Sequence, residues 1–190
     1  MLRLTKTPAM LFSKKLKNIA IIQLIEKDLD KLCSIEGDDI KNNNSKKNYL
    51  YQSYVVHLMA GWQEFHKSLV EYAFSALEKK NGSNTMTEIA RWRINDLLKK
   101  FNTPNTENIN NLYKNSFGIL SISQSWVFVD LNNKAAMQLL NKVLLARHQI
   151  AHKGVSIDKL SYSLNFENME VIYKMACATE KHVFTSLNIE

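Results

Sequence analysis

An unbroken apolar seam between residues 51 and 76 is the feature that most constrains how this chain can fold. Apolar side chains recur there at alternating spacings of four and three residues: Tyr51, Val55, Leu58, Trp62, Phe65, Leu69, Tyr72 and Ala76. This heptad-like period is typical of the central helix of an antiparallel helical bundle. We interpret the aromatic members as core residues, because such periodicity is mainly a burial signal.

The rest of the chain also favours helices. Only 5 of the 190 residues are Gly and 2 are Pro, which suits long helices better than a turn-rich all-β fold. A chain of 190 residues fits one domain with a sizeable core. We therefore predict an all-α protein, an antiparallel bundle of four core helices plus one or two extra helices, in a single domain over residues 1–190.

Turn and capping residues predict where the helices of the first half begin and end. A first helix is expected over residues 11–32, and a polar loop over residues 36–47. The seam helix should end at residues 81–83, which read Asn-Gly-Ser. Thr85 and Glu88 then have the spacing of a capping box, which predicts a third helix from this point.

The second half of the chain is expected to hold three further helices. Pro104 suits the first turn of a short helix, and residues 117–130 are expected to form a loop. A fifth helix is predicted over residues 132–152, stopped by Gly154. Asn165 is expected to cap the last helix.

The charge balance points towards a polyanionic partner. The sequence has 25 Lys and Arg against 18 Asp and Glu, a formal charge of +7. Lysines and arginines that neutralise phosphates release condensed counterions, so a basic surface favours nucleic acid. The alternative is that this charge only keeps the protein soluble.

The two cysteines and the lack of a long apolar run point to a reducing, aqueous compartment. Cys33 and Cys177 stand apart within apolar helical patterns, so we expect reduced core thiols rather than a disulfide. No signal peptide is evident, and no stretch approaches the length needed to span a bilayer. We expect a cytoplasmic protein that does not contact membranes.

The predicted fifth helix breaks its own apolar pattern. Leu140, Val143, Arg147 and Ile150 share the spacing of a core stripe, yet one of them is Arg. A guanidinium on an apolar stripe is costly unless a carboxylate or phosphate pairs with it. This position is therefore a candidate functional residue.

Two histidines accompany this arginine. His148 and His152 are four residues apart, which places them on one helical face. Arg147 and His152 are five apart, roughly 140° around an ideal helix, so they could flank a cleft but not reach the same atom. An imidazole can exchange a proton with a ribose hydroxyl or a leaving oxygen, and an arginine can hold phosphate oxygens as charge develops. Together these residues suit RNA cleavage without a metal.

Two other readings of these residues remain open. The Arg and His side chains could simply interact with the carbonyl groups at the helix C-terminus. The spacing of His148 and His152 also suits zinc, but Gln149 stands where the HExxH motif has Glu, and no third ligand cluster is near in sequence. We therefore expect neither a metal nor a cofactor.

The motif and its surroundings resemble a known family. Residues 147–154 read RHQIAHKG, which is similar to the R-(polar)-x-x-x-H motif of HEPN domains and close to the RHxIAHG form of the RiboL-PSP-HEPN group. The long helix with Trp62 and Phe65 resembles the second helix of that group, and residues 101–126 resemble its middle region. The resemblance spans about residues 48–188, the expected HEPN core, with residues 1–47 forming the N-terminal helix and polar loop.

The resemblance implies a specific activity. HEPN domains are helical bundles that dimerise and bring two such motifs into one cleft. Many are metal-independent endoribonucleases of toxin–antitoxin, abortive-infection or other antiviral systems, and they leave 2′,3′-cyclic phosphate and 5′-hydroxyl ends. By position, Arg147 and His152 would be the catalytic pair, with His148 as the polar residue after the Arg.

The chain departs from the family pattern in a few places. Lys153 stands where relatives often have Gly, and it is a candidate RNA contact. No Tyr lies two residues after His152, so the group that is adenylylated at such a Tyr fits poorly. Glu64 follows the helix-two aromatic one position later than the acid of related sequences, and it is a candidate orienting residue.

The expected partners follow from this reading. RNA is expected in single-stranded or loop regions, where the backbone is flexible enough for in-line attack. A second copy of the chain should complete the site, and an antitoxin or regulatory protein should restrain it. Two alternatives are a non-catalytic module that binds RNA, a nucleotide or a protein partner, and a regulatory subunit that only pairs with a toxin. The paired Arg147 and His152 argue against the non-catalytic module.

Overall fold

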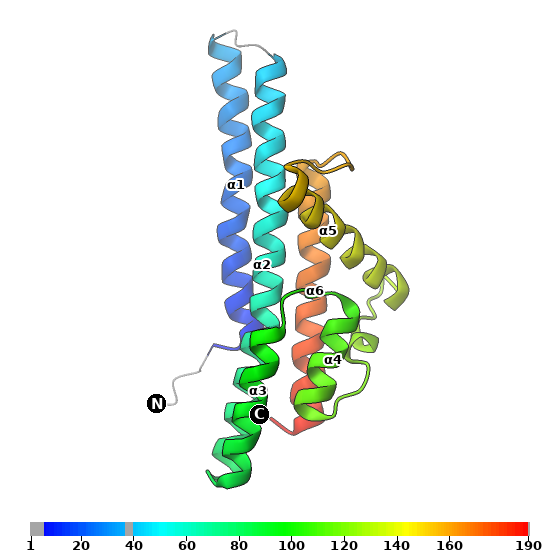
Figure 1. The fold of residues 1–190 in the computed structure, drawn as a ribbon. Helices are drawn as coiled ribbons and strands as arrows, with labels where there is room; N and C mark the ends of the chain where they lie inside the picture. Colours follow the sequence, from blue (N-terminus) through cyan, green and yellow to red (C-terminus); the bar gives the residue numbers. More distant parts are fainter. Residues whose placement is uncertain (1–5, 37–39, 190) are drawn as a thin grey trace.

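The structure, a computed structural model, describes residues 6–36 and 40–189 and is built almost entirely from helices (Figure 1). The elements are α1 (Pro8–Glu36), α2 (Ile40–Asn81), α3 (Thr85–Lys100), α4 (Thr106–Phe117), the 3₁₀ helix η1 (Ile122–Ser125), α5 (Asn133–Lys153) and α6 (Tyr162–Leu187). Within the described residues there is no strand, and Phe128 and Leu131 form an isolated β-bridge. The predicted all-α class is confirmed.

α2 is the central helix of the bundle, as the apolar seam predicted. It packs against α1, α3, α4, α5 and α6. The middle of the seam, from Val55 to Leu69, is buried, whereas Tyr51 and Ala76 near its ends are partly exposed. Burial of large apolar side chains is the main stabilising contribution to a bundle of this kind.

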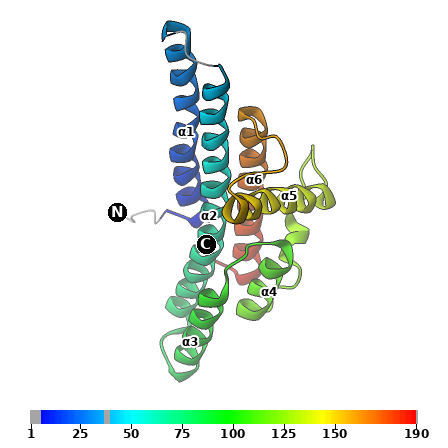
Figure 2. The same cartoon turned by 45° about the horizontal axis from the view of Figure 1, so that its top comes forward.

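α1 lies antiparallel beside α2, and the two helices form a long hairpin (Figures 1 and 2). The Phe12 ring lies 5.6 Å from the Phe65 ring. A Cβ added to Gly61 would come within 3.1 Å of the Phe12 ring. The Glu180 carboxylate of α6 accepts hydrogen bonds from the Thr7 hydroxyl (2.9 Å) and the Ala9 amide (2.7 Å). At its other end the hairpin extends beyond α5 and α6 (Figures 1 and 2).

The predicted polar loop is wrong over residues 40–47, which form the first two turns of α2. Asn43 is buried there, and Lys47 pairs with Asp30 and Glu26 of α1. The hydrogen bond to Asp30 raises the pKa of Lys47. Tertiary contacts with α1 therefore outweigh the weak helix propensity of this asparagine-rich segment. Residue 36 of the predicted loop is the last residue of α1, and residues 37–39 lie outside the described residues.

α3 begins one residue earlier than the capping box predicted. The N-cap is Asn84, whose side-chain oxygen accepts hydrogen bonds from the Met86 (2.9 Å) and Thr87 (3.1 Å) amides. The Thr87 hydroxyl accepts in return from the Asn84 amide at 2.7 Å. The box is therefore Asn84 with Thr87, because an asparagine caps better than a threonine and Asn84 precedes the expected Thr85.

Two further helix starts also differ from the prediction. Pro104 precedes α4, whose N-cap is Asn105. The Pro104 carbonyl accepts a hydrogen bond from the Trp62 indole at 3.2 Å. The N-cap of α6 is Ser161 rather than Asn165. Asn165 is buried inside the helix, where its amide donates to the Tyr51 carbonyl at 3.1 Å. α4 begins after Pro104 because Asn105 is the N-cap, and Asn165 does not cap α6 because its side chain bonds to Tyr51 instead.

The connection from α4 to α5 is irregular, as predicted, apart from η1. Trp126 is fully buried, and its indole donates to the Thr179 hydroxyl of α6 at 2.9 Å. The Ser123 amide donates to the Asn110 side chain of α4 at 3.0 Å. These bonds fix the connection to the bundle just before α5 begins.

A buried histidine lies at the centre of the core. His66 is 0% exposed and its ring lies among the rings of Trp62, Phe65, Phe101 and Tyr113. Its Nδ1 is hydrogen-bonded to the Tyr113 hydroxyl at 2.9 Å, and Nε2 has no hydrogen-bond partner in the described part of the chain. Burial lowers the pKa of His66 to about 3. His66 is therefore a neutral core residue.

The predicted burial of the cysteines is wrong for Cys177, which is exposed on α6 next to the buried Ala176. The side chain of Cys33 lies outside the described residues. Among the described helices, none is long and apolar enough to cross a membrane.

Candidate active site

α5 carries the candidate residues, and its ends match the prediction. The Asn132 side chain caps its start by accepting from the Ala135 amide at 2.9 Å. Gly154 ends it with φ of 73°, in the left-handed region that glycine adopts without a Cβ penalty, and donates its amide to the Ile150 carbonyl at 3.0 Å. The candidate residues therefore occupy the last two turns of a well-defined helix.

The buried side of α5 does not reach the end of the helix. Its buried residues are Ala136, Leu140, Val143 and Ala146. Beyond Ala146, the side chain of Ile150 is partly exposed and the remaining residues up to Lys153 are mostly exposed. α5 crosses α2 and α6, and its C-terminal end lies over α2 (Figures 1 and 2).

Arg147 is exposed, which corrects the expectation of a paired arginine on a core stripe. It follows Leu140 and Val143 in the apolar pattern, but the helix has passed the core at this point. Arg147 makes no ion pair or hydrogen bond with any other residue that the structure describes. Its guanidinium is available to a phosphate or a carboxylate from outside the chain.

His148 and His152 lie side by side on one face, as the spacing predicted. Their ring centroids are 4.3 Å apart with the planes inclined at 49°. Both rings are exposed, and so is Lys153 in the last turn. Arg147, His148, His152 and Lys153 therefore form a solvent-accessible basic end of α5.

Gln149 has a positioning role that sequence reasoning missed. Its side-chain oxygen accepts a hydrogen bond from the Ile157 amide at 3.0 Å. The bond holds the connection after Gly154 against the helix turn that lies between Arg147 and His152. The only signal for this role in the sequence was the presence of a hydrogen-bonding side chain inside the motif.

Glu64, the candidate orienting residue, is exposed on α2. It makes no hydrogen bond or ion pair with another residue of the described chain. Within a single chain, the structure does not link it to Arg147 or His152.

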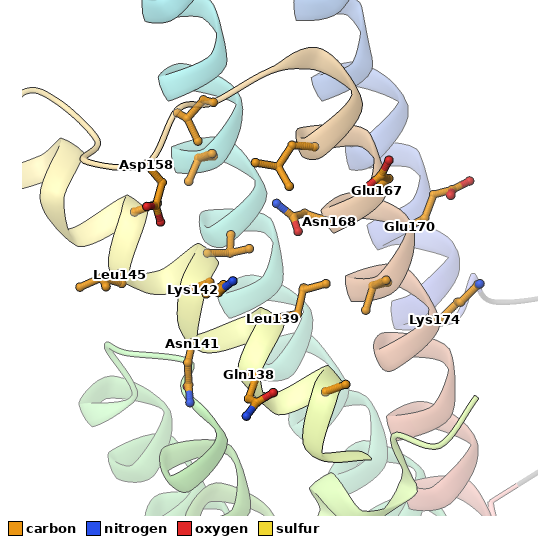
Figure 3. Close-up of a pocket in the computed structure, with 17 residues that line it drawn as sticks. Gln138, Leu139, Asn141, Lys142, Leu145, Asp158, Glu167, Asn168, Glu170 and Lys174 are labelled. Carbon is orange, nitrogen blue, oxygen red and sulfur yellow. The ribbon is translucent and has the colours of Figure 1, made fainter. Parts of the chain in front are cut away.

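An open groove of about 1110 Å³ lies beside the candidate site, between α5 and α6 (Figure 3). Charges of both signs line it, including Lys142, Asp158, Glu167, Glu170 and Lys174. Arg147, His148 and His152 are not among its lining residues. The groove and the basic end of α5 are therefore two separate surfaces of the same helix.

The structure also bears on metal ligands. No group of three or more His, Cys, Asp or Glu side chains in the described residues could hold a metal ion. His148 and His152 accordingly have no third ligand beside them in the part of the chain that the structure describes.

The fold and the motif together define a class of protein: a helical bundle whose penultimate helix ends in an exposed Arg-x₄-His sequence. The RiboL-PSP-HEPN family model matches residues 17–184, from α1 to α6. The chain therefore belongs to the RiboL-PSP-HEPN family, as the sequence resemblance implied. Neither a curated protein nor a solved structure matches it significantly.

Proposed function

We propose that the protein is a metal-independent endoribonuclease that acts as a toxin or antiviral defence effector. The observation that carries this proposal is the exposed basic end of α5 in a chain of the RiboL-PSP-HEPN family. Arg147 has no carboxylate partner among the described residues, so its charge is available to an RNA phosphate.

The reaction needs a base, an acid and a group that holds phosphate. His152 takes the proton of the ribose 2′-hydroxyl as its oxygen attacks the adjacent phosphorus. The bond from phosphorus to the 5′-oxygen breaks, and a general acid supplies the proton of the leaving oxygen. Arg147 binds the non-bridging oxygens as charge develops on them. The products are a 2′,3′-cyclic phosphate and a 5′-hydroxyl.

A second copy of the chain completes the site in this proposal. Arg147 and His152 are roughly 140° apart around α5, so one helix presents them to different sides of a bound phosphate. A two-fold interface places the same end of α5 opposite itself and supplies a second pair. The exposure of all four basic residues at the end of α5 supports such an arrangement, because nothing within the described chain covers them.

His148 and Lys153 have supporting roles. His148, with its ring 4.3 Å from that of His152, serves as the second acid or base or fixes the orientation of the His152 ring. Lys153 contacts the RNA backbone. Glu64 orients a catalytic group only if the partner copy brings it near, since it makes no polar contact within the described chain.

Unpaired RNA is the proposed substrate. In-line attack by a 2′-hydroxyl needs a flexible backbone, which single strands and loops provide. The formal charge of +7 favours association with such a polyanion. A free ribonuclease would harm its host, so we expect an antitoxin, another regulatory protein or a trigger to restrain it.

The test is RNA cleavage in EDTA by purified wild type, His152→Ala and His182→Ala. His182 is a matched control because it is an exposed histidine near the far end of α6. We expect discrete products with cyclic-phosphate ends from the wild type and His182→Ala. The rate of His152→Ala should fall by about 10²–10⁴-fold, the usual contribution of general acid–base catalysis.

Cleavage by His152→Ala at the wild-type rate would contradict the proposed site. If folded wild type binds RNA but leaves it intact, alone and with extracts of stressed host cells, the non-catalytic binding module is the better description. EDTA-sensitive cleavage would contradict the metal-independent mechanism.

A further inference from the structure

α1 carries an apolar face that points away from the bundle. Its buried side consists of Ala9, Phe12, Leu16 and Ile19. Ile21 lies on the opposite side, about 160° from Ile19 around the helix. We define the outer face of α1 by the exposed residues that lie within about 60° of Ile21: Met10, Lys14, Lys17, Asn18, Ile21, Leu24, Ile25, Asp28 and Leu32.

The apolar residues of this outer face are well exposed. Ile21 and Leu24 each expose 55% of their surface, and Leu32 exposes 52%. α1 packs only against α2 and α6 among the described elements, and both views place it at the edge of the molecule (Figures 1 and 2). A single exposed apolar residue is ordinary, but a row of them along one helix face marks an interaction surface.

The charges on the outer face are arranged for antiparallel self-pairing about Ile21. Lys14 lies seven residues before Ile21, and Asp28 lies seven residues after it. When a two-fold axis passes through Ile21, Lys14 of one copy faces Asp28 of the other, and both such pairs form at once. In a parallel pair, Lys14 would face Lys14 and Asp28 would face Asp28.

The apolar residues at the centre and the two ends of the face follow the same symmetry, whereas Leu24 would lie opposite Asn18. Met10 and Leu32 lie eleven residues on either side of Ile21, so each end of the face meets an apolar residue of the other copy. Lys17 would lie opposite Ile25, where its methylene stem can cover the apolar side chain while its ammonium stays in water. The contact would extend for about 33 Å along the helix at the usual rise per residue.

We infer that the outer face of α1 is a homotypic interface, on which α1 of a second copy packs antiparallel about Ile21. α1 and the C-terminal end of α5 lie on different sides of α2 in both views (Figures 1 and 2). This interface is therefore distinct from the one that would pair two α5 ends. A chain that uses both interfaces assembles beyond a dimer.

The test is the molar mass of the intact protein by light scattering over a range of concentrations. We expect Ile21→Asp to halve the mass of the wild-type assembly, because it places a carboxylate at the centre of the apolar contact. The halving is expected whether the wild type is a dimer or a tetramer, so its failure would not bear on the proposed nuclease or on the α5 interface. Circular dichroism should show unchanged helix content, since Ile21 is exposed.

A charge exchange tests the antiparallel arrangement. Lys14→Glu and Asp28→Lys should each weaken pairing by about tenfold, because each turns two attractive contacts into repulsive ones. The combined variant restores opposite charges and should return to within about threefold of the wild type. Lys15→Glu is the matched control, since Lys15 is exposed but lies about 120° away from Ile21 around the helix.

Two results would overturn the inference. One is equal mass for the wild type and Ile21→Asp at every concentration, even if another protein binds the face. The other is a combined variant that pairs as weakly as the single variants, since that would exclude the antiparallel contact of Lys14 with Asp28.

Discussion

His66 and His152 are the same residue type in opposite environments. His66 lies in the middle of α2, fully buried among aromatic rings, and burial lowers its pKa to about 3. His152 lies at the end of α5, exposed, with the His148 ring beside it. The first is held by packing and stays neutral near neutral pH. The second is accessible to a substrate.

The difference in exposure follows from how much of each helix is covered by its neighbours. α2 is surrounded by other helices, so its histidine became part of the core. The last buried residue of α5 is Ala146, so the last two turns of this helix are not covered by the core. A helix end that extends past the core can present charged residues without the desolvation cost of buried charges. Stability and activity should therefore respond to different residues.

The largest expected effect is on activity. Arg147→Ala should lower RNA cleavage by about 10²–10³-fold, as removal of a group that stabilises transition-state charge usually does. Its free energy of unfolding should stay within about 0.5 kcal/mol of the wild type, because the side chain is exposed and unpaired within the described chain. Single-turnover cleavage and urea unfolding measure the two quantities.

Arg147→Lys sharpens this prediction. A lysine keeps the charge but cannot bind two phosphate oxygens in the fork geometry of arginine, so it should recover only part of the lost rate. A stability loss of several kcal/mol in Arg147→Ala would show instead that this arginine supports the fold.

The next effect is on stability and comes from the buried histidine. The pKa of His66 is about 3 in the folded protein, below the ordinary value of 6.5. Between these values the unfolded state binds the proton and the folded state does not, so stability falls as pH decreases below 6.5. The expected slope is about 1.4 kcal/mol per pH unit, or about 2 kcal/mol by pH 5.

His66→Phe should remove this slope, whatever its effect on stability at neutral pH. Urea unfolding of the wild type and His66→Phe between pH 7 and pH 5 measures the difference in their free energies of unfolding. Both proteins have the same carboxylates, so the contributions of these groups cancel in the difference. Parallel pH profiles for the two proteins would mean that His66 keeps its proton-binding ability when folded.

The comparison also shows what sequence patterns can predict. The seam of α2 and the ends of α5 were predicted closely, because regular spacing and strong stop residues act locally. The helical state of residues 40–47 was missed because it depends on contacts with Glu26 and Asp30 of α1, which local propensity does not contain.

The candidate site was predicted in part. The shared face of His148 and His152 follows from helix geometry and is confirmed by their ring contact. The exposure of Arg147 was not predicted, because a periodic pattern does not show where a helix passes beyond its neighbours. The catalytic roles of Arg147 and His152 stay predictions until cleavage is measured.

A smaller effect compares two glycines in the same backbone conformation. Gly154 and Gly82 both follow a helix with φ of 73° and 78°, and neither has an atom within 4 Å of an added Cβ. Replacing either by Ala should cost about 1 kcal/mol of stability through backbone strain alone. Only Gly154→Ala should also lower cleavage, because Gly154 ends the helix two residues after His152. Equal cleavage by both variants would show that the end of α5 tolerates distortion.

The smallest effect concerns the hydrogen bond from the Ile157 amide to Gln149. Gln149→Ala removes an exposed acceptor, so the stability loss should be about 0.5 kcal/mol, at the low end for a hydrogen bond. Hydrogen exchange at the Ile157 amide should become faster, because this amide would then bond only to water. Gln149→Glu keeps an acceptor oxygen and should preserve the protection, which separates the hydrogen bond from the amide group itself. If Gln149→Ala exchanges at the wild-type rate, the bond does not hold the connection in solution, and any loss of cleavage in that variant would have to arise from contact with RNA.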